Sequence, residues 1–202
     1  MSLTPPEMVL EACAFLQTED PVPFPLPVEG IESVVAGGFS GIEKTDWVFP
    51  GLRERVGAVL RNCPAERLVD GHAGARPYRV APVSTSPSTR LLQACGVAMA
   101  QDTDGAVLCF LGQGSAATGA FYEALNLIAL HQLNVIVLTY RRNLSSSDSP
   151  LCPQVAGSLV SKAESFGIQS SSINGRDYET VKKAVAKARQ AGGPHLIEAL
   201  LD

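Results

Sequence analysis

The residues best suited to chemistry follow an apolar segment near the middle of the chain. After the strand-like run AVLCFL comes GQGSAA, which leads into a long run of helix-forming residues. Ligands bind beyond the carboxyl ends of the strands in open parallel sheets, and the first N–H groups of a helix attract anions. We therefore expect a phosphate group here, although the spacing matches neither common nucleotide fingerprint and a plain turn is the alternative. The predicted ligand-binding residues of this turn are Gly112, Gln113, Gly114, Ser115 and Ala116.

Two arginines and an asparagine follow the next strand-like run. Arg141, Arg142 and Asn143 end the run VIVLTYRRN, so a parallel sheet would bring them to the same edge as the glycine turn. Arginine forks suit phosphate oxygens, which favours further anion contacts at this edge. A solvent-exposed loop with surface ion pairs is the alternative for the same residues.

Acid–base and metal chemistry have fewer candidate residues. His72, in the glycine-rich run DGHAGAR, is the histidine that we consider as a proton-transfer group, with a polar surface loop as the alternative. His131, at a helix end, and His195, at the start of a buried strand, are expected to be structural. The five cysteines are widely spaced and lack a CxxC pair, which fits neither a disulfide framework nor a zinc site.

Composition places the chain among globular proteins. The 202 residues are 46% hydrophobic and 18% charged, which is enough for a sizeable core in one domain. A net charge of −4 leaves no broad basic surface for nucleic acid or an anionic membrane. The N-terminal residues lack the basic and apolar regions of a signal peptide, and no apolar run reaches membrane-spanning length. We expect a cytoplasmic protein that binds neither nucleic acid nor membrane.

The elements that must position these residues change in character near residue 82. The first part is irregular, with a helix over 5–17, a proline-rich extended segment, a short helix over 30–36, a strand at TDWVF and a helix around 52–60. After it, helix and strand patterns alternate, and the continuously apolar runs AVLCFL and VIVLTY are typical of strands in a parallel sheet buried on both faces. Helices are predicted over 88–101, 115–131, 154–166 and 177–191, and strands over 106–111, 134–140, 168–173 and 195–200.

These elements predict an α/β fold with a parallel sheet and helices on both faces. We expect residues 1–29 to form an N-terminal helix and a proline-rich extended segment. Residues 30–202 are expected to form a single domain that carries the glycine turn.

The segment from Gly112 to Asn143 resembles the diphosphate-binding motif of a known family. This family is the alpha subunit of the thiamine-diphosphate-dependent 2-oxo acid dehydrogenase first component, found in pyruvate, branched-chain and acetoin dehydrogenases. The runs GIESVVAGG and DWVFPGLRERVGAVL and the stretch from AESFG to LIEAL are also similar to the family, so the resemblance covers roughly residues 30–200. It implies a thiamine-diphosphate-binding fold and a cofactor held between alpha and beta subunits. The positions that follow the motif are Gly112, Gly114, Gly119, Glu123, Ala124 and Asn126.

The positions that the resemblance assigns to the metal carry unusual residues. Gln113 stands where the family has an aspartate that binds magnesium, and Arg142 stands where it has an asparagine. Magnesium prefers oxygen ligands that include a carboxylate, so thiamine diphosphate is the candidate cofactor and magnesium is not expected. Arg53 keeps the arginine that the resemblance assigns to the diphosphate, whereas Leu52 and Arg55 replace a tyrosine and a histidine. The family's loop with an active-site histidine would follow the last predicted strand.

Three interpretations of the function remain open. In the first, Arg53 and Arg142, with Arg141 beside them, replace the metal and hold thiamine diphosphate or another phosphorylated molecule. In the second, the chain is a diverged paralogue that has lost diphosphate binding and serves assembly. In the third, it is an active decarboxylase subunit that acts on a 2-oxo acid or acetoin together with a beta-like subunit. Because the helix predicted over 115–131 is apolar almost all round, we expect a homo-oligomer or a complex with a beta-like subunit.

Overall fold

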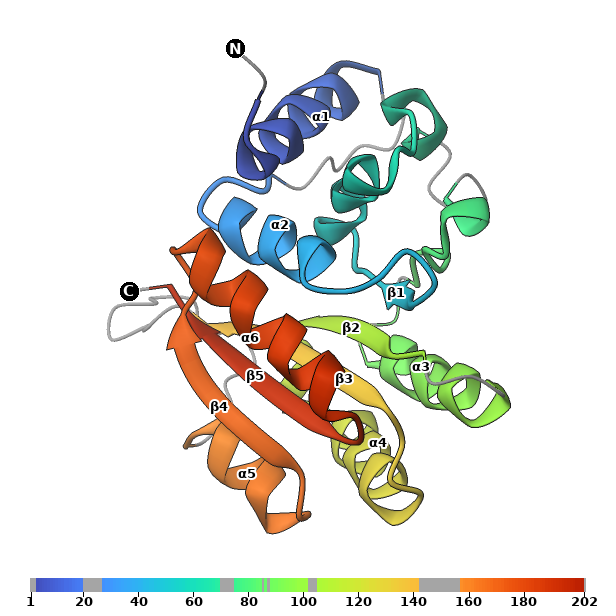
Figure 1. Cartoon of the computed structure of the whole chain (residues 1–202), viewed down its shortest axis with the longest axis vertical. Coiled ribbons are helices and arrows are strands. Elements are labelled where there is room, and N and C mark those ends of the chain that lie inside the picture. The colour runs from blue at the N-terminus through green and yellow to red at the C-terminus, as the bar shows by residue number, and fades with distance from the viewer. Residues whose placement is uncertain are drawn as a thin grey trace.

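Five parallel strands form one sheet in the computed structural model, which describes residues 3–19, 27–69, 75–84, 86, 88–101, 105–141 and 157–201. The strands are β1 (Trp47–Phe49), β2 (Val107–Gly112), β3 (Val135–Arg141), β4 (Gln169–Asn174) and β5 (His195–Leu200). They are arranged in the order β1-β2-β3-β5-β4, and each neighbouring pair is parallel (Figure 1). The structure confirms the four strands predicted after residue 87, each to within one residue, and the strand predicted at TDWVF.

Helices cover both faces of this sheet, which confirms the predicted α/β fold (Figure 1). One face carries α2 (Glu32–Ser40) and α6 (Tyr178–Ala191), with α1 (Pro5–Glu19) and the 3-10 helix η1 (Glu54–Arg61) packed beside them. The other face carries α3 (Thr89–Ala100), α4 (Gly119–Leu130) and α5 (Leu159–Ser165). The remaining 3-10 helices are η2 (Ala65–Leu68), η3 (Arg76–Tyr78) and η4 (Ser115–Ala117).

Successive side chains of a strand point to opposite faces of the sheet, so each strand contributes to two hydrophobic cores. Leu108 and Phe110 of β2 pack toward α2, whereas Cys109 and Leu111 pack toward α3 and α4. Two glycines of α2 allow this helix to approach the sheet. A Cβ on Gly38 would lie 2.5 Å from the Phe110 ring, and a Cβ on Gly37 would lie 2.6 Å from Val181 of α6. The run VVAGG therefore forms a helix whose small residues permit close packing on β2 and α6.

Two predicted helices differ from the observed ones in this part of the chain. The helix expected around 52–60 is the 3-10 helix η1, which begins at Glu54, and Leu52 precedes it and is 37% exposed. The helix expected over 154–166 is observed as α5, and residues 154–156 lie outside the described residues.

Val9, Cys13 and Leu16 of α1 share one core with α2 and η1.

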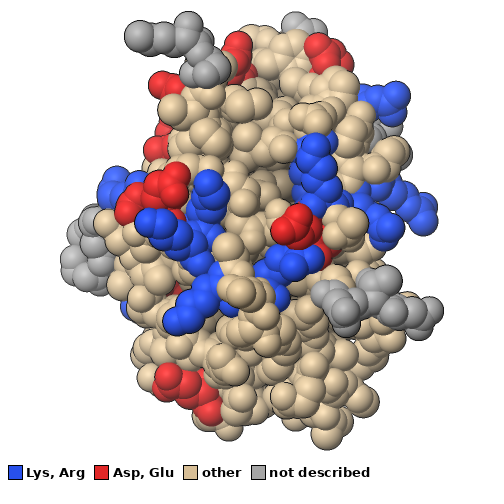
Figure 2. Space-filling model, viewed as in Figure 1, with Lys and Arg blue, Asp and Glu red and all other residues tan. Residues whose placement is uncertain are grey.

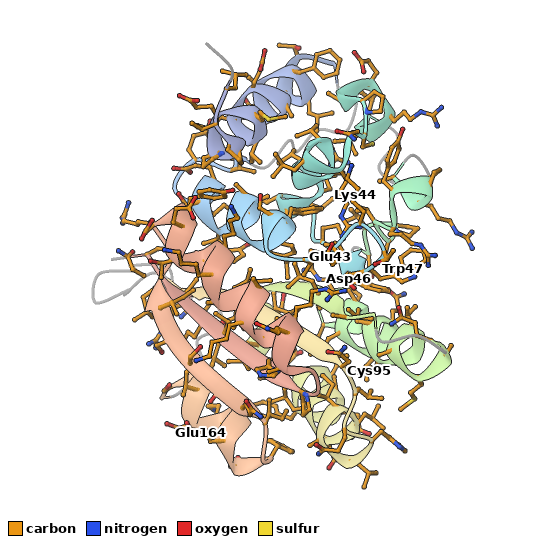
Figure 3. The ribbon with its side chains drawn as sticks, in the orientation of Figure 1. Glu43, Lys44, Asp46, Trp47, Cys95 and Glu164 are labelled. Carbon is orange, nitrogen blue, oxygen red and sulfur yellow. The ribbon has the colours of Figure 1, made fainter. Side chains whose placement is uncertain are left out.

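Buried charges hold the loop that leads into β1. The Arg61 guanidinium donates hydrogen bonds to four carbonyl oxygens, and burial lowers its pKa to about 10. Asp46 is fully buried, accepts a hydrogen bond from the Ala106 amide, and lies 2.6 Å from Arg189 Nε of α6. Figure 3 shows Asp46 with Glu43 and Lys44 beside Trp47. Asp46 thus joins the residue before β1 to the start of β2 and to α6 near the C-terminus. The carbonyl acceptors of Arg61 belong to Glu43, Lys44, Asp46 and Tyr78.

The charged side chains are unevenly spread over the surface. Figure 2 shows lysine and arginine side chains across the middle of the visible face, over the region of α6, and a mostly uncharged lower part. Among the described residues, no helix is both long enough and apolar enough to cross a membrane.

Candidate functional site

The glycine turn lies at the carboxyl ends of the central strands, as the sequence predicts. β2 ends at Gly112, which pairs in register with Tyr140 near the end of β3. Gln113 and Gly114 form the turn that follows, and Ser115 begins η4. This edge is the position at which parallel sheets bind ligands.

A buried carboxylate occupies the same edge. Glu54, the first residue of η1, is 3% exposed, and its Oε2 accepts a hydrogen bond of 2.6 Å from the Gly51 amide. Its Oε1 accepts a second hydrogen bond from the Tyr140 hydroxyl. The carboxylate thus joins η1 to β3, although the two elements are far apart in sequence.

Arg90 completes this group of buried polar residues. It is the second residue of α3, and its Nη1 lies 3.8 Å from Glu54 Oε2. A Cβ on Gly51 would lie 2.0 Å from Arg90 Nη1 and 2.5 Å from Glu54 Oε2, so position 51 requires a glycine. We refer to Gly51, Glu54, Arg90 and Tyr140 as the edge cluster.

The electrostatics of the edge cluster keep Tyr140 protonated. Burial, and then the neighbouring Glu54 carboxylate, raise the pKa of the Tyr140 hydroxyl far above its usual range, against the opposing charges of Arg53 and Arg90. Arg53 directly precedes η1, and its Nε is buried without a hydrogen-bond partner among the described residues. Two arginines therefore act on the hydroxyl that lies nearest to the end of β2.

The glycines of the turn have no steric reason within the chain itself. Neither Gly112 nor Gly114 has a positive φ, so the turn does not require the conformational freedom of glycine. A Cβ on Gly112 would lie 3.5 Å from the Tyr140 hydroxyl, an ordinary contact, and a Cβ on Gly114 would meet no atom of the described residues within 4 Å. The predicted turn is present at Gln113 and Gly114, but its backbone conformation does not need glycine, and among the described residues the space beside the Gly114 backbone is open.

The helix predicted to begin at Ser115 begins instead at Gly119. Residues Ser115–Ala117 form the separate 3-10 turn η4, and Thr118 is extended, with φ −103° and ψ 154°. The Ser115 carbonyl accepts hydrogen bonds from the hydroxyls of Ser88, at 2.7 Å, and Thr118, at 3.0 Å. Because these hydroxyls compete for a carbonyl that an α-helix would use, the α-helical pattern cannot continue through Thr118. The amides of η4 are thus not the start of a long helix.

Arg141 lies on the opposite face of the sheet from the edge cluster. Tyr140 and Arg141 are adjacent in β3, so their side chains point to opposite faces. Arg141 Nε lies 3.3 Å from Glu198 Oε1, and Ser172 donates a hydrogen bond of 3.2 Å to the other oxygen of this buried carboxylate. Arg141 therefore does not join Arg53 in the structure.

Several other predicted residues are away from this edge or outside the described residues. Arg142, Asn143 and His72 are not among the described residues, so their predicted roles stay predictions. His131 ends α4, and the buried His195 begins β5 at the opposite end of the strands. Cys13, Cys63, Cys95 and Cys109 are buried and free, in agreement with a structural role. Among the described residues, no three His, Cys, Asp or Glu side chains form a metal-binding group.

Sequence reasoning recognised only part of this site. It singled out Arg53 and the glycine turn, but it missed Glu54, Tyr140 and Arg90 as a connected group. Three successive charged residues, Arg53, Glu54 and Arg55, within the otherwise apolar run LRERVGAVL were the available signal for Glu54. Arg53 is the buried donor near Tyr140 that can bind an anion, while Glu54 and Arg90 carry opposite charges beside each other.

Comparisons with known proteins show the family of this chain. The sequence model of the "Dehydrogenase E1 component" family matches residues 4–201. The chain is 31% identical to the 3-methyl-2-oxobutanoate dehydrogenase subunit alpha of Mycobacterium tuberculosis, over 92% of this chain and 54% of that protein. It is 29% identical to the 2-oxoisovalerate dehydrogenase subunit alpha of Bacillus subtilis, over 89% of this chain and 62% of that protein. The chain thus spans only about half of the first relative's length and less than two thirds of the second's.

Solved structures show the same fold. Transketolase from Campylobacter jejuni matches 99% of this chain and 38% of its own length, with a TM-score of 0.71 and 19% identity. An enzyme from Mycobacterium smegmatis described as thiamin diphosphate-dependent matches 84% of this chain and 31% of its own length, with a TM-score of 0.61 and 18% identity. At these identities the likeness concerns the arrangement of strands and helices.

Proposed function

Because this chain belongs to the dehydrogenase E1 component family, we propose that it is an alpha-like subunit whose sheet edge binds a diphosphate without a metal ion. The observation that carries the proposal is Arg53. Its Nε is buried and lacks a hydrogen-bond partner among the described residues, beside the hydroxyl of Tyr140. A buried donor of this kind is costly unless a ligand accepts its hydrogen bond.

Thiamine diphosphate is the ligand that we infer for this edge. Arg53 would bind its diphosphate, and the open space beside Gly114 would allow the phosphate oxygens to approach the backbone. When bound, this cofactor supplies a carbanion that adds to a carbonyl carbon, and the protein binds and orients it. The resemblance of the glycine turn to the family's diphosphate motif supports the same ligand.

Among the described residues, those of this edge do not fit magnesium. Gln113 offers a neutral amide oxygen, and the guanidinium groups of Arg53 and Arg90 offer only donors. The carboxylate of Glu54 already accepts hydrogen bonds from Gly51 and Tyr140 and lies beside Arg90. We therefore propose that arginine charge replaces the metal, and no step of the proposed function passes through magnesium.

A beta-like subunit would complete the site. Tyr140 keeps its proton and Glu54 is already hydrogen-bonded, so neither residue of the edge cluster is suited to transfer a proton. The relatives named above are alpha subunits, which supports a partner that supplies the remaining groups. A homo-oligomer is the alternative assembly.

A second candidate function is an active decarboxylase subunit that acts with a beta-like partner. The names of the relatives favour it, because each is a subunit of a 2-oxo acid dehydrogenase. It differs from the first candidate in requiring turnover by the complex rather than binding alone. Turnover of a branched-chain 2-oxo acid by the assembled chains, measured with an artificial electron acceptor, distinguishes the two.

Native mass spectrometry tests the proposed binding and assembly together. The purified chain is sprayed with thiamine diphosphate in the presence of EDTA, with and without a beta-subunit homologue encoded in the same genome. We expect a mass increase of one thiamine diphosphate without magnesium, and a hetero-oligomer when the homologue is present. Binding that appears only with magnesium would contradict the metal-free site, and absence of a complex would contradict the alpha-like role.

A further inference from the structure

A cavity lies at the β1 edge of the sheet, away from the edge cluster. Residues 79–81 pair with β1, since the Val48 amide donates to the Arg79 carbonyl at 2.9 Å and the Ala81 amide donates to the Val48 carbonyl at 2.8 Å. Between this extended segment and α3 is a cavity of about 450 Å³. None of its lining residues belongs to the edge cluster.

The walls of this cavity are apolar and partly aromatic. Trp47 and Phe49 of β1 line it together with Val97 of α3. Figure 3 shows Trp47 beside β1, at the side of the sheet that carries α3. Arg79 lies over the Trp47 ring at 5.3 Å and does not line the cavity, so this contact supports the indole from outside. Apolar walls of this size are typical of pockets that take small organic ligands, which have volumes of about 300 to 1,000 Å³.

A few polar groups lie among these apolar walls. Arg76 of η3 brings one positive charge, and Gln93 of α3 and Ser84 bring neutral groups able to donate hydrogen bonds. Arg76 has no ion pair in the part of the chain that the structure describes. A single guanidinium with neutral neighbours matches one carboxylate better than a doubly charged phosphate.

We propose that this cavity, which we name the Trp47 pocket and define by Trp47, Phe49, Arg76, Ser84, Gln93 and Val97, binds a small carboxylate that carries an aromatic ring. The ring lies between the aromatic and aliphatic walls, where aromatic pairs favour offset or edge-to-face contact. The carboxylate lies at Arg76, with Gln93 and Ser84 as further donors. The proposal rests on this pocket alone and does not depend on diphosphate binding at the edge cluster.

Trp47 provides a direct probe, because it is the one tryptophan in the sequence. The full chain is titrated with 3-phenylpropionate while tryptophan fluorescence is recorded, since the phenyl ring does not absorb where tryptophan is selectively excited. We expect a saturable change in emission. The uncharged amide 3-phenylpropionamide should bind at least about tenfold more weakly, because it cannot form a charge-assisted hydrogen bond with Arg76.

Two variants and a control locate the binding. Arg76→Gln should weaken 3-phenylpropionate binding about tenfold, and Val97→Phe should weaken binding of both compounds by narrowing the cavity. Arg67→Gln, on η2 and outside the pocket lining, should leave binding unchanged. The proposal is overturned if no saturable change occurs, if the acid and the amide bind equally, or if Arg76→Gln binds like the unmodified chain.

Discussion

The Tyr140 hydroxyl donates a hydrogen bond to the Glu54 carboxylate, and this contact joins β3 to η1 across 86 positions of the sequence. Glu54 also accepts a hydrogen bond from the Gly51 amide and lies beside Arg90 of α3. One buried carboxylate therefore connects three separate segments at the edge where we place the ligand. The following predictions concern this arrangement.

Loss of the Tyr140 hydroxyl should destabilise the fold modestly. Tyr140→Phe removes one hydrogen bond to a charged group, while Glu54 keeps its contacts with Gly51 and Arg90, so we expect a loss of about 1.5 to 3 kcal/mol in the free energy of unfolding. Urea unfolding measures it. Tyr78→Phe serves as the control, because Tyr78 does not belong to the edge cluster. Equal losses in the two variants would contradict the role given to the Tyr140–Glu54 contact.

Alkaline pH should reduce the stability difference between the unmodified chain and Tyr140→Phe. Burial and Glu54 raise the pKa of Tyr140, so its contribution is full below its ordinary pKa of about 10 and is lost as the pH rises above that value. The unfolding free energy of the unmodified chain should therefore fall more steeply than that of the variant above about pH 10. Burial also raises the pKa of Cys63 and Cys95 to about 11, but these thiols are present in both proteins. Parallel pH profiles would contradict the buried, protonated tyrosine.

Removal of Arg90 should leave Glu54 without its neighbouring positive charge. We expect Arg90→Met to lower the free energy of unfolding by about 3 to 5 kcal/mol, because it leaves a buried carboxylate uncompensated. The double variant Glu54→Gln with Arg90→Met should lose less than the sum of the two single variants. Urea unfolding of the four proteins supplies this cycle, and strict additivity would show that the two side chains do not interact.

A methyl group at position 114 should affect the ligand and not the fold. Gly114 has open space at its Cβ position and no positive φ, so Gly114→Ala should change stability by less than about 0.5 kcal/mol. The same methyl group would occupy the space that we assign to the diphosphate, so the affinity of Gly114→Ala for thiamine diphosphate should fall at least about tenfold. Gly96→Ala on α3, which also meets no atom within 4 Å, is the matched control and should bind normally. Unchanged diphosphate affinity in Gly114→Ala would place the ligand elsewhere.

The strands could be predicted because short apolar runs in the sequence indicate buried strands. β2 and the first four residues of β3 are continuously apolar, which is typical of strands covered on both faces, and β5 carries the buried Glu198 among apolar residues; each strand was predicted to within one residue. The resemblance of the glycine turn then indicated the family, and the family match over residues 4–201 confirmed it. The division at residue 30 stays a prediction.

The edge cluster could not be predicted in the same way. Residues 51, 54, 90 and 140 come together only because two crossover connections, from β1 to β2 and from β2 to β3, bring their segments to one end of the sheet. The start of α4 was wrong for a similar reason. The hydroxyl of Ser88, 27 positions earlier in the sequence, binds the Ser115 carbonyl and helps to end the first turn, and helix propensity carries no information about such a contact.

Calorimetry of thiamine diphosphate binding in EDTA, with the unmodified chain and Arg53→Gln, tests the central claim most directly. We predict saturable binding without a metal, no change in affinity when magnesium is added, and an affinity at least about tenfold lower in Arg53→Gln, because a charge-assisted hydrogen bond is lost. Arg67→Gln, on the exposed 3-10 helix η2, controls for the change in net charge. Binding that requires magnesium, or equal affinity in Arg53→Gln and the unmodified chain, would contradict the proposal that arginine takes the place of the metal.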